Sequence, residues 1–345
     1  MRNTIGIIGH FGSNLDFCDG QTVKTKNLAE QLEHNGYSIY KVDTYFKSSK
    51  LTLLLRTLKC LLTCRHIFLL VSTNGMKFYL PFLHYINKVT KRRIYHYVVG
   101  SELLKLVAQD DRYVRFLNSL NVNWFEYESG TELLKQLGVR NAVTLPNFKA
   151  LNPVPGAQPY TATDGCFRFC TFSRIMEEKG ISDAIETVCA INTHHGYQAE
   201  LDIYGPIDPD YDATFQGLLR EHQDFVSYKG VADSKKSVEV LKDYYALLFP
   251  THWAGEGVPG TLIDAFAAGI PVIASDWNAN RELVRHKKQG LLYPNEEMTS
   301  LTDAALWAVH HPEAMNLMRV HSREEYDRYT PETVMKEIFV RMDER

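Results

Sequence analysis

Two carboxylates stand in a stretch whose backbone is rich in glycine and proline. In GEGVPGTLIDAFAAGIPVIASD, residues 255–276, Glu256 lies in the glycine-rich part, and Asp264 follows eight positions later within an expected helix. Gly257 and Gly260 let the backbone approach a ligand, and the free N–H groups at the helix start suit a phosphate. The carboxylates would repel a phosphate but can accept hydrogen bonds from hydroxyl groups. The stretch therefore predicts a ligand with both phosphates and hydroxyl-rich rings, such as a nucleotide-sugar.

A pair of cations precedes a second expected helix. Arg174 and Lys179 bracket the turn in SRIMEEKG, between an expected strand and a helix that begins near Ser182. Two cations at a helix N-terminus form an anion site, to which the helix dipole adds. The alternative is a solvated loop with two unrelated charges. In the same way, Asp264 has the alternative of being only an acid that favours a helix start.

The loop after the first expected strand is the third candidate. It reads HFGSNLDFCDGQT, and its Gly12 and Gly20 leave the backbone free to approach a diphosphate. The G-x-G-x-x-G fingerprint of dinucleotide-binding proteins is not present in it. A simple surface loop explains the same residues, so this segment is weak evidence by itself.

Strands that alternate with helices must position these loops. The alternation predicts parallel strands joined by crossover helices, and ligands of such sheets bind beyond the carboxyl ends of the strands. A linker with three prolines and two glycines, residues 151–165, separates two such series and predicts two domains with a cleft between them. The strands are expected at 5–9, 38–45, 66–72, 92–100, 121–129 and 141–147, and then at 167–173, 199–205, 224–230, 245–250 and 271–275.

Length and composition agree with a two-domain globular protein. The 345 residues are 45% hydrophobic and carry a formal net charge of −3. We expect no secretion signal, because Met1–Thr4 leads directly into a short apolar run, and no membrane-spanning helix. The pairs Cys60/Cys64 and Cys166/Cys170 lack zinc-site spacing, so we expect reduced thiols and a cytoplasmic protein.

The charge is distributed unevenly along the chain. Residues 1–150 hold 20 Lys and Arg against 11 Asp and Glu, and residues 44–101 contain no acid. A field of one sign predicts an anionic partner: nucleic acid, an acidic membrane surface or a phosphorylated substrate. Leucines and cations share the expected helix over 51–63, which favours an anionic lipid surface contacted through basic residues 47–93. The alternative is a core helix with a solvated basic face. No nucleic-acid motif is present, so we expect no nucleic-acid partner.

The chain resembles the retaining glycosyltransferases of family 4. The resemblance is carried by FSRIMEEKGISDAIE, LDIYG, VSYKGVAD, YYALLFPTHWAGEGVPGTLIDAFAAGIPVIASDWNANRELV and GLLYP, which occur in the family's order and spacing over residues 167–295. The amino-terminal half is more loosely similar, through YVVGS, YES and LPN, to the branch that builds bacterial surface polysaccharides.

The resemblance implies a GT-B fold of two Rossmann-like α/β domains, whose parallel sheets face an interdomain cleft. Residues 1–155 would form the acceptor-side domain, to which a crossover helix at about 325–345 returns. Residues 160–320 would form the domain that binds the nucleotide-sugar donor.

The resemblance also implies a role for each candidate residue. Glu256 matches the acid that binds donor-sugar hydroxyls, and Asp264 matches the acid that binds the ribose, although the family usually has Glu there. Arg174 and Lys179 match the pair that holds the diphosphate. The donor would also contact Gly257, Val258, Pro259, Gly260 and Thr261.

Four further positions follow from the same resemblance. The main chain of Val231 would read the base. Gly20 and Gln21 match the loop that faces the diphosphate, where Asp19-Gly20 replaces the usual Gly-Gly. His96 would lie near the sugar and join Glu256, Arg174 and Lys179 as a catalytic residue. A structural histidine on a strand is the alternative for His96.

The resemblance implies a retaining, metal-independent hexosyltransferase without a cofactor. It would move a hexose or N-acetylhexosamine from a nucleotide-sugar, with UDP favoured over GDP, to a lipid-diphosphate-linked saccharide. The product would belong to a capsule, exopolysaccharide or O-antigen, and the enzyme would be cytoplasmic and peripheral on the inner face of the plasma membrane. The alternatives are a sugar-nucleotide epimerase of the GT-B type and a non-catalytic nucleotide-sugar-binding scaffold subunit.

Overall fold

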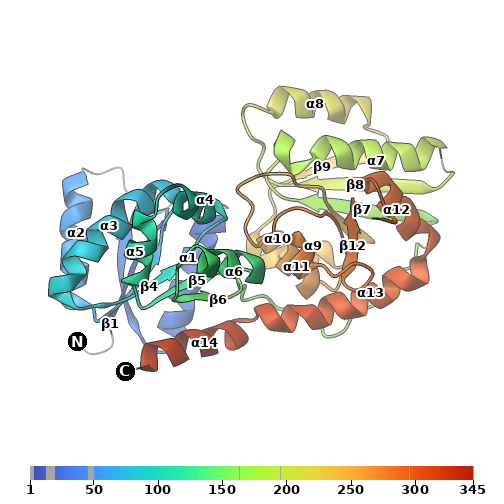
Figure 1. Cartoon of the computed structure of the whole chain (residues 1–345). Helices are drawn as coiled ribbons and strands as arrows, with labels where there is room; N and C mark the ends of the chain where they lie inside the picture. Colours follow the sequence, from blue (N-terminus) through green and yellow to red (C-terminus); the bar gives the residue numbers. More distant parts are fainter. Residues whose placement is uncertain are drawn as a thin grey trace. The chain divides into compact units, whose positions relative to one another are not determined.

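The computed structural model describes residues 4–12, 20–45, 50–162, 164–194, 196–294 and 296–344. Its contacts divide the chain into two units (Figure 1). The first unit comprises residues 1–150 together with 331–345, and the second comprises residues 151–330. The division falls at the start of the proline-containing linker, because that segment already packs with the second unit.

The first unit alternates strands and helices. Its elements are β1 (Thr4–Gly9), α1 (Gly20–His34), β2 (Ser38–Asp43), α2 (Lys50–Thr63), β3 (His66–Leu70), α3 (Thr73–Thr90), β4 (Arg93–Tyr97), α4 (Glu102–Gln109), α5 (Arg112–Asn118), β5 (Val122–Phe125), α6 (Glu128–Gln136), β6 (Ala142–Thr144) and α14 (Pro331–Asp343).

The six strands of the first unit form one parallel sheet in the order β2-β1-β3-β4-β5-β6. A buried cluster joins α1 and α14 to side chains of β1, β3, β4 and β5. The strand order reverses between β1 and β3, so the carboxyl end of β1 lies at the switch point where open α/β sheets bind ligands.

The second unit repeats the alternation. Its elements are β7 (Cys166–Phe172), η1 (Glu177–Lys179), α7 (Ile181–His194), β8 (Gln198–Tyr204), α8 (Asp212–Glu221), β9 (Val226–Gly230), η2 (Ser234–Lys236), α9 (Ser237–Leu241), β10 (Ala246–Phe249), α10 (Gly260–Ala267), β11 (Val272–Ser275), α11 (Asn280–Leu283), β12 (Gly290–Tyr293), α12 (Leu301–His310), α13 (Pro312–Glu325) and η3 (Tyr326–Tyr329).

Its six strands also form a parallel sheet, in the order β12-β11-β10-β7-β8-β9. Counted within this unit, the order is 6-5-4-1-2-3, which is that of the Rossmann fold. The switch point lies between β7 and β10, where Leu247 pairs with Cys170. The prediction of two parallel α/β sheets is therefore confirmed.

The structure refines several expected elements. The strand expected over 121–129 ends at Phe125 as β5, and α6 begins at Glu128, whose carboxylate favours the start of a helix. Cys60, Cys64, Cys166 and Cys170 are buried free thiols. Among the described residues, no helix combines the length and the hydropathy needed to cross a membrane.

Candidate active site

Two loops of the second unit meet at its switch point. The loop after β7 carries Arg174 and leads through η1 to α7, while the loop after β10 runs from Pro250 to the start of α10. Because β7 and β10 are parallel neighbours, both loops emerge at the same edge of the sheet. Main-chain bonding joins them, since the N–H of His252 donates to the carbonyl oxygen of Glu178 at 2.9 Å.

A buried ion pair lies between these loops. Nζ of Lys179 donates a hydrogen bond to Oε2 of Glu256, and each side chain is only 9% exposed. The hydroxyl of Thr251 donates to the same carboxylate oxygen at 3.1 Å. A buried charge is tolerated only with a partner of opposite sign and further hydrogen bonds. The fold therefore brings together a cation and a carboxylate that are 77 residues apart in sequence.

Aromatic rings surround the ammonium group of this pair. Nζ of Lys179 lies 4.8 Å from the centre of the Trp253 ring and 5.8 Å from that of Phe249. Both distances are within the range of cation–π attraction. Trp253 is 40% exposed, so an apolar ring that solvent partly reaches lies beside the ion pair.

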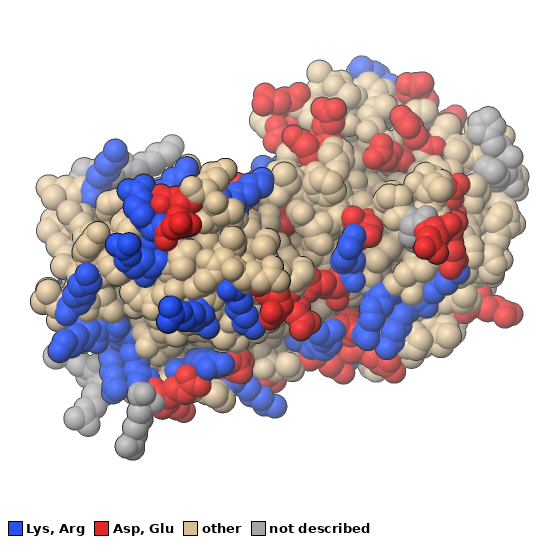
Figure 2. All heavy atoms as spheres, in the orientation of Figure 1, with Lys and Arg blue, Asp and Glu red and all other residues tan. Residues whose placement is uncertain are grey.

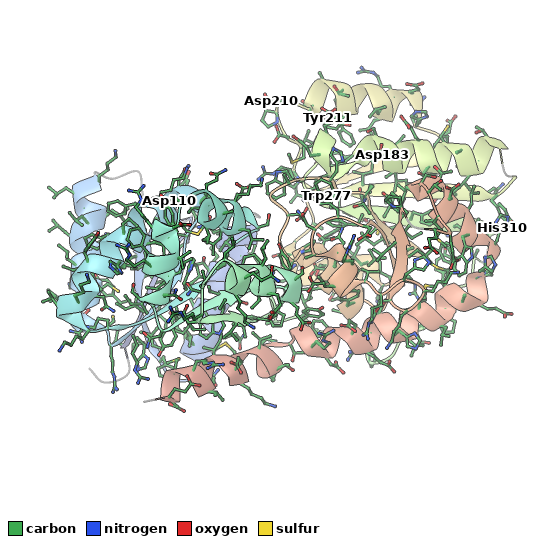
Figure 3. The ribbon with its side chains drawn as sticks, in the orientation of Figure 1. Asp110, Asp183, Asp210, Tyr211, Trp277 and His310 are labelled. Carbon is green, nitrogen blue, oxygen red and sulfur yellow. The ribbon has the colours of Figure 1, made fainter. Side chains whose placement is uncertain are left out.

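A third loop, after β11, supports the segment that carries Glu256. The indole N–H of Trp277, labelled in Figure 3, donates to the carbonyl oxygen of Trp253 at 2.9 Å. The side-chain amide of Asn278 donates to the carbonyl oxygen of Glu256 at 3.2 Å. Asn278 has a φ of 46°, in the left-handed region that Asn adopts more readily than most residues.

The sequence reasoning missed Thr251, Trp253, Trp277 and Asn278. Trp253 and Trp277 flank the carboxylate stretch in the sequence, and this was an available signal, because tryptophan is enriched at binding surfaces. The hydrogen bonds that they make could not be read from sequence order.

Helix α10 begins four residues after Glu256. It starts at Gly260 after Pro259, and no side-chain hydrogen bond caps this end. The hydroxyl of Thr261 donates to the carbonyl oxygen of Phe172, the last residue of β7, at 2.6 Å. This bond fixes the helix start at the end of the neighbouring strand. The first-turn N–H groups and the Lys179 ammonium thus lie at one edge, as an anion site requires.

Asp264 faces the interior of the second unit. Its side chain is buried in α10, and the hydroxyl of Ser237, the first residue of α9, donates to Oδ1 at 2.7 Å. Asp264 and Glu256 therefore have different surroundings. The predicted contact of Asp264 with a ribose remains a prediction, and Ser237 is a residue that the sequence reasoning missed.

Two other predicted donor contacts lie at the same edge of the sheet. Arg174 is exposed, two residues beyond β7. Val231 is 55% exposed and directly follows β9, which ends at Gly230 with a φ of 81°. All strands are parallel, so Arg174, Val231, Lys179 and Glu256 occupy the carboxyl edge, although no described contact joins the first two to the ion pair.

The two donor-contact residues predicted in the first unit, Gly20 and Gln21, lie in that unit's own sheet region. Gly20 is exposed at the start of α1, and the amide of Gln21 donates to the carbonyl oxygen of Leu70, the last residue of β3, at 3.3 Å. Both therefore lie at the switch point of their own sheet, and their contact with a donor remains a prediction. Asp19, and with it residues 13–18, lies outside the described residues.

His96 is completely buried within β4. Its Nδ1 is 3.1 Å from Oδ1 of Asn123 on β5. Burial lowers the pKa of His96 to about 4, so the ring is neutral near pH 7. The ring has no exposed surface, so the predicted contact of His96 with a sugar and the structural alternative both stay predictions.

The fold and the edge that carries these residues define a class, the GT-B proteins built from two Rossmann-like units. Residues 166–311 match the family model described as glycosyl transferases group 1. The matched segment runs from the start of β7 to the end of α12 and includes the whole Lys179–Glu256 site. Over this segment the chain is similar to the group 1 glycosyltransferases.

Similar proteins fall into two groups. The amylovoran biosynthesis glycosyltransferase AmsK of Erwinia amylovora is 28% identical over 39% of this chain and 34% of its own length. The putative colanic acid biosynthesis glycosyltransferase WcaL of Escherichia coli K12 is 29% identical over 44% of this chain and 37% of its own length. The chain thus spans about a third of the length of these curated relatives. The structure of Anabaena HepE in complex with UDP and glucose matches with a TM-score of 0.71 at 14% identity, covering 98% of this chain and 99% of HepE.

Proposed function

We propose that this protein is a retaining hexosyltransferase of the EC 2.4 class. It would transfer a hexose or N-acetylhexosamine from a UDP-sugar to a lipid-diphosphate-linked saccharide during the synthesis of a capsule, exopolysaccharide or O-antigen. The buried Lys179–Glu256 pair at the switch point carries this proposal. A nucleoside diphosphate sugar offers an anion to Lys179 and hydroxyl groups to Glu256, so one ligand can satisfy both charges.

The relatives support the choice of donor and pathway. AmsK and WcaL are named for the biosynthesis of surface polysaccharides, and HepE of the same fold binds UDP and glucose. We extend these names to the present chain as a proposal, because the matches to AmsK and WcaL cover only part of each protein.

The proposed reaction needs stabilisation of the leaving group. The acceptor hydroxyl forms a bond to the anomeric carbon as the bond from that carbon to the diphosphate oxygen breaks. The acceptor proton passes to a phosphate oxygen, and UDP leaves. Arg174, Lys179 and the N-terminus of α10 would stabilise the charge that develops on the diphosphate, without a metal ion. Glu256 would orient the donor sugar, and Asp264 would contact the ribose from α10.

Nucleotide binding is the first test. We expect UDP and UDP-sugars to raise the melting temperature by several degrees without added metal, while GDP, ADP and CMP do not. The Lys179→Ala variant should show no such shift. Its transfer rate should be at least 10²-fold lower than that of the parent, which is the magnitude typical of a lost oxyanion donor. Lys287→Ala is a matched control, because Lys287 pairs with Glu297 on the surface of the same unit. A Lys179→Ala rate within threefold of the parent rate would overturn the proposed role.

Three measurements test the configuration of the product and separate the two alternatives. Nuclear magnetic resonance of the product should show the same anomeric configuration as the donor. Conversion of a nucleotide-sugar without any acceptor would favour an epimerase. Binding of UDP-sugar without turnover in the presence of membrane-extracted acceptor would favour a scaffold subunit.

We also propose that the protein is cytoplasmic and associates with the inner face of the plasma membrane. The acid-free segment of the first unit supports this, through basic residues 47–93. Lys47 lies outside the described residues, and the basic residues from Lys50 onward are described. Association with this surface would place the enzyme where a lipid-linked acceptor lies.

A further inference from the structure

Exposed apolar side chains gather on two neighbouring helices of the first unit. Of the 13 large hydrophobic residues that are exposed in the described part of the chain, six belong to α2 and α3. Scattered exposed apolar residues are normal on a protein surface, but a concentrated group marks an interaction surface. These six are Leu51, Leu55, Leu62, Phe78, Tyr85 and Val89.

The spacing places them in one stripe on each helix. On α2 the stripe is Leu51, Leu55 and Leu62, with the half-buried Leu58 completing an i, i+4, i+7, i+11 series. Such spacing keeps side chains on one helical face. The buried residues of α2, Thr57, Cys60 and Leu61, lie outside this series. The stripe is therefore not the face that packs on the sheet.

Helix α3 repeats the pattern with aromatic residues. Phe78, Tyr85 and Val89 are exposed, and the half-buried Phe82 occupies the remaining position of the same i, i+4, i+7, i+11 series. The rings of Phe78 and Phe82 stack at a centroid distance of 5.7 Å. Phe and Tyr are side chains that amphipathic helices place at the boundary between lipid headgroups and acyl chains.

The two helices are joined to each other. The hydroxyls of Thr57 on α2 and Tyr79 on α3 lie 3.3 Å apart in the interior. At the other end, Nε of Arg92, just beyond α3, donates to the carbonyl oxygen of Leu61 at 2.6 Å. The two stripes therefore belong to one continuous surface, which we call the α2–α3 face.

Cations flank both stripes. Lys50, Arg56 and Lys59 on α2 and Lys77 and Lys88 on α3 are exposed, and no Asp or Glu occurs from residue 44 to residue 101. Figure 2 shows Lys and Arg side chains among uncharged ones over the part of the first unit where Figure 1 labels α2 and α3. A second copy of this face would be repelled, whereas an anionic lipid surface is attracted.

We propose that the α2–α3 face inserts its two apolar stripes into the headgroup region of an anionic lipid bilayer. The inference rests on the proposed membrane association and makes it specific. Weak apolar insertion and a basic patch are each insufficient for stable binding, but together they supply the two signals that stable binding needs. Binding by this face differs from electrostatic adsorption, because inserted side chains continue to hold the protein when salt screens the charges.

Vesicle flotation tests the proposal. We expect the protein to float with vesicles containing 30% phosphatidylglycerol but not with pure phosphatidylcholine vesicles, and to keep part of this binding in 0.5 M NaCl. Leu55→Glu and Val89→Glu, at positions 57% and 81% exposed, should each lower the vesicle partition coefficient at least tenfold. Leu317→Glu on α13 is the matched control, at 58% exposure in the second unit, and should bind as the parent does.

Other outcomes would overturn the proposal. Absence of the parent from anionic vesicles would exclude a lipid occupant and favour a protein partner. If salt abolished vesicle binding while Leu55→Glu and Val89→Glu left it unchanged, the α2–α3 face would bind lipid by electrostatic attraction alone, without insertion. Self-association of the parent that Leu55→Glu removes would make a second copy the occupant.

Two further measurements keep these results interpretable. The variants should retain the parent melting temperature and the shift caused by UDP, so a failure of docking is distinct from a failure of the proposed transferase. A fluorophore on Val89→Cys should show a blue shift with anionic vesicles, while one on Leu317→Cys should not. Equal shifts at the two positions would contradict insertion through this face.

Discussion

Removing the cation of the buried pair should destabilise the second unit. In Lys179→Met the carboxylate of Glu256 loses its ionic partner while its side chain stays within a site that is only 9% exposed. Breaking a buried pair from one side costs about 3–5 kcal/mol. Glu256 keeps the hydrogen bond from the Thr251 hydroxyl at 3.1 Å, so we expect the lower end of this range, about 3 kcal/mol.

A double-mutant cycle isolates the interaction. Glu256→Gln alone leaves Lys179 buried without its partner, so it should also be destabilising. In the double variant Lys179→Met/Glu256→Gln no unpaired charge remains, and the coupling between the two positions should be about 2 kcal/mol. The exposed pair Lys287–Glu297 is the control, and Lys287→Met should cost less than about 0.5 kcal/mol.

Urea unfolding followed by tryptophan fluorescence is a suitable assay. Of the four tryptophans, Trp253, Trp277 and Trp307 lie in the second unit and only Trp124 in the first, so the signal reports mainly on the unit that holds the pair. The buried-pair reasoning would be refuted if Lys179→Met lowered the free energy of unfolding by less than about 1 kcal/mol. It would also be refuted if the destabilisation of the double variant equalled the sum of the destabilisations of the two single variants.

Two further predictions concern buried polar groups. The pKa of His96 is about 4 in the folded protein, so between pH 7 and pH 5 only the unfolded chain takes up a proton at this residue. Over this range the free energy of unfolding of the parent should fall by about 2 kcal/mol more than that of His96→Gln. Equal decreases in urea unfolding would contradict the assignment. Ser237→Ala removes a hydrogen bond to the buried Asp264 carboxylate and should lower the free energy of unfolding by about 2 kcal/mol. Ser227 is exposed, so Ser227→Ala should leave the stability unchanged. Calorimetric melting of both variants tests this difference.

The proposed transferase and the proposed docking surface belong to different units. The donor chemistry is argued from the loops after β7 and β10 of the second unit, and the lipid contact from α2 and α3 of the first. Variants of one feature should therefore leave the other unchanged. Measurement of UDP binding and of vesicle binding on the same set of variants tests this independence.

Local patterns determined much of the architecture in advance. The alternation of apolar runs with helical periodicity indicated two series of parallel strands, because strands that follow crossover helices must run in the same direction. The glycine and proline of GEGVPG indicated a loop that ends at a helix start, and α10 begins at Gly260. These features depend on residues close together in the chain, so the sequence was sufficient for them.

Element boundaries were less predictable. The segment 121–129 has strand-like composition throughout, yet the strand ends at Phe125 and α6 begins at Glu128. Composition cannot show where a chain leaves the sheet, because that point depends on the neighbouring strand β6, which pairs only as far as Phe125.

The sequence by itself determined which residue types reach the carboxyl edge of the second sheet, and only the tertiary structure decided which of them meet. Arg174 and Lys179 look equivalent in the sequence, but the fold buries Lys179 against Glu256 and leaves Arg174 exposed. Asp264 resembles Glu256 in type, yet it faces Ser237 in the interior. The reason is physical: the strand order 6-5-4-1-2-3 makes β7 and β10 neighbours, and this pairing arises from packing across the sheet, which spacing along the chain does not encode.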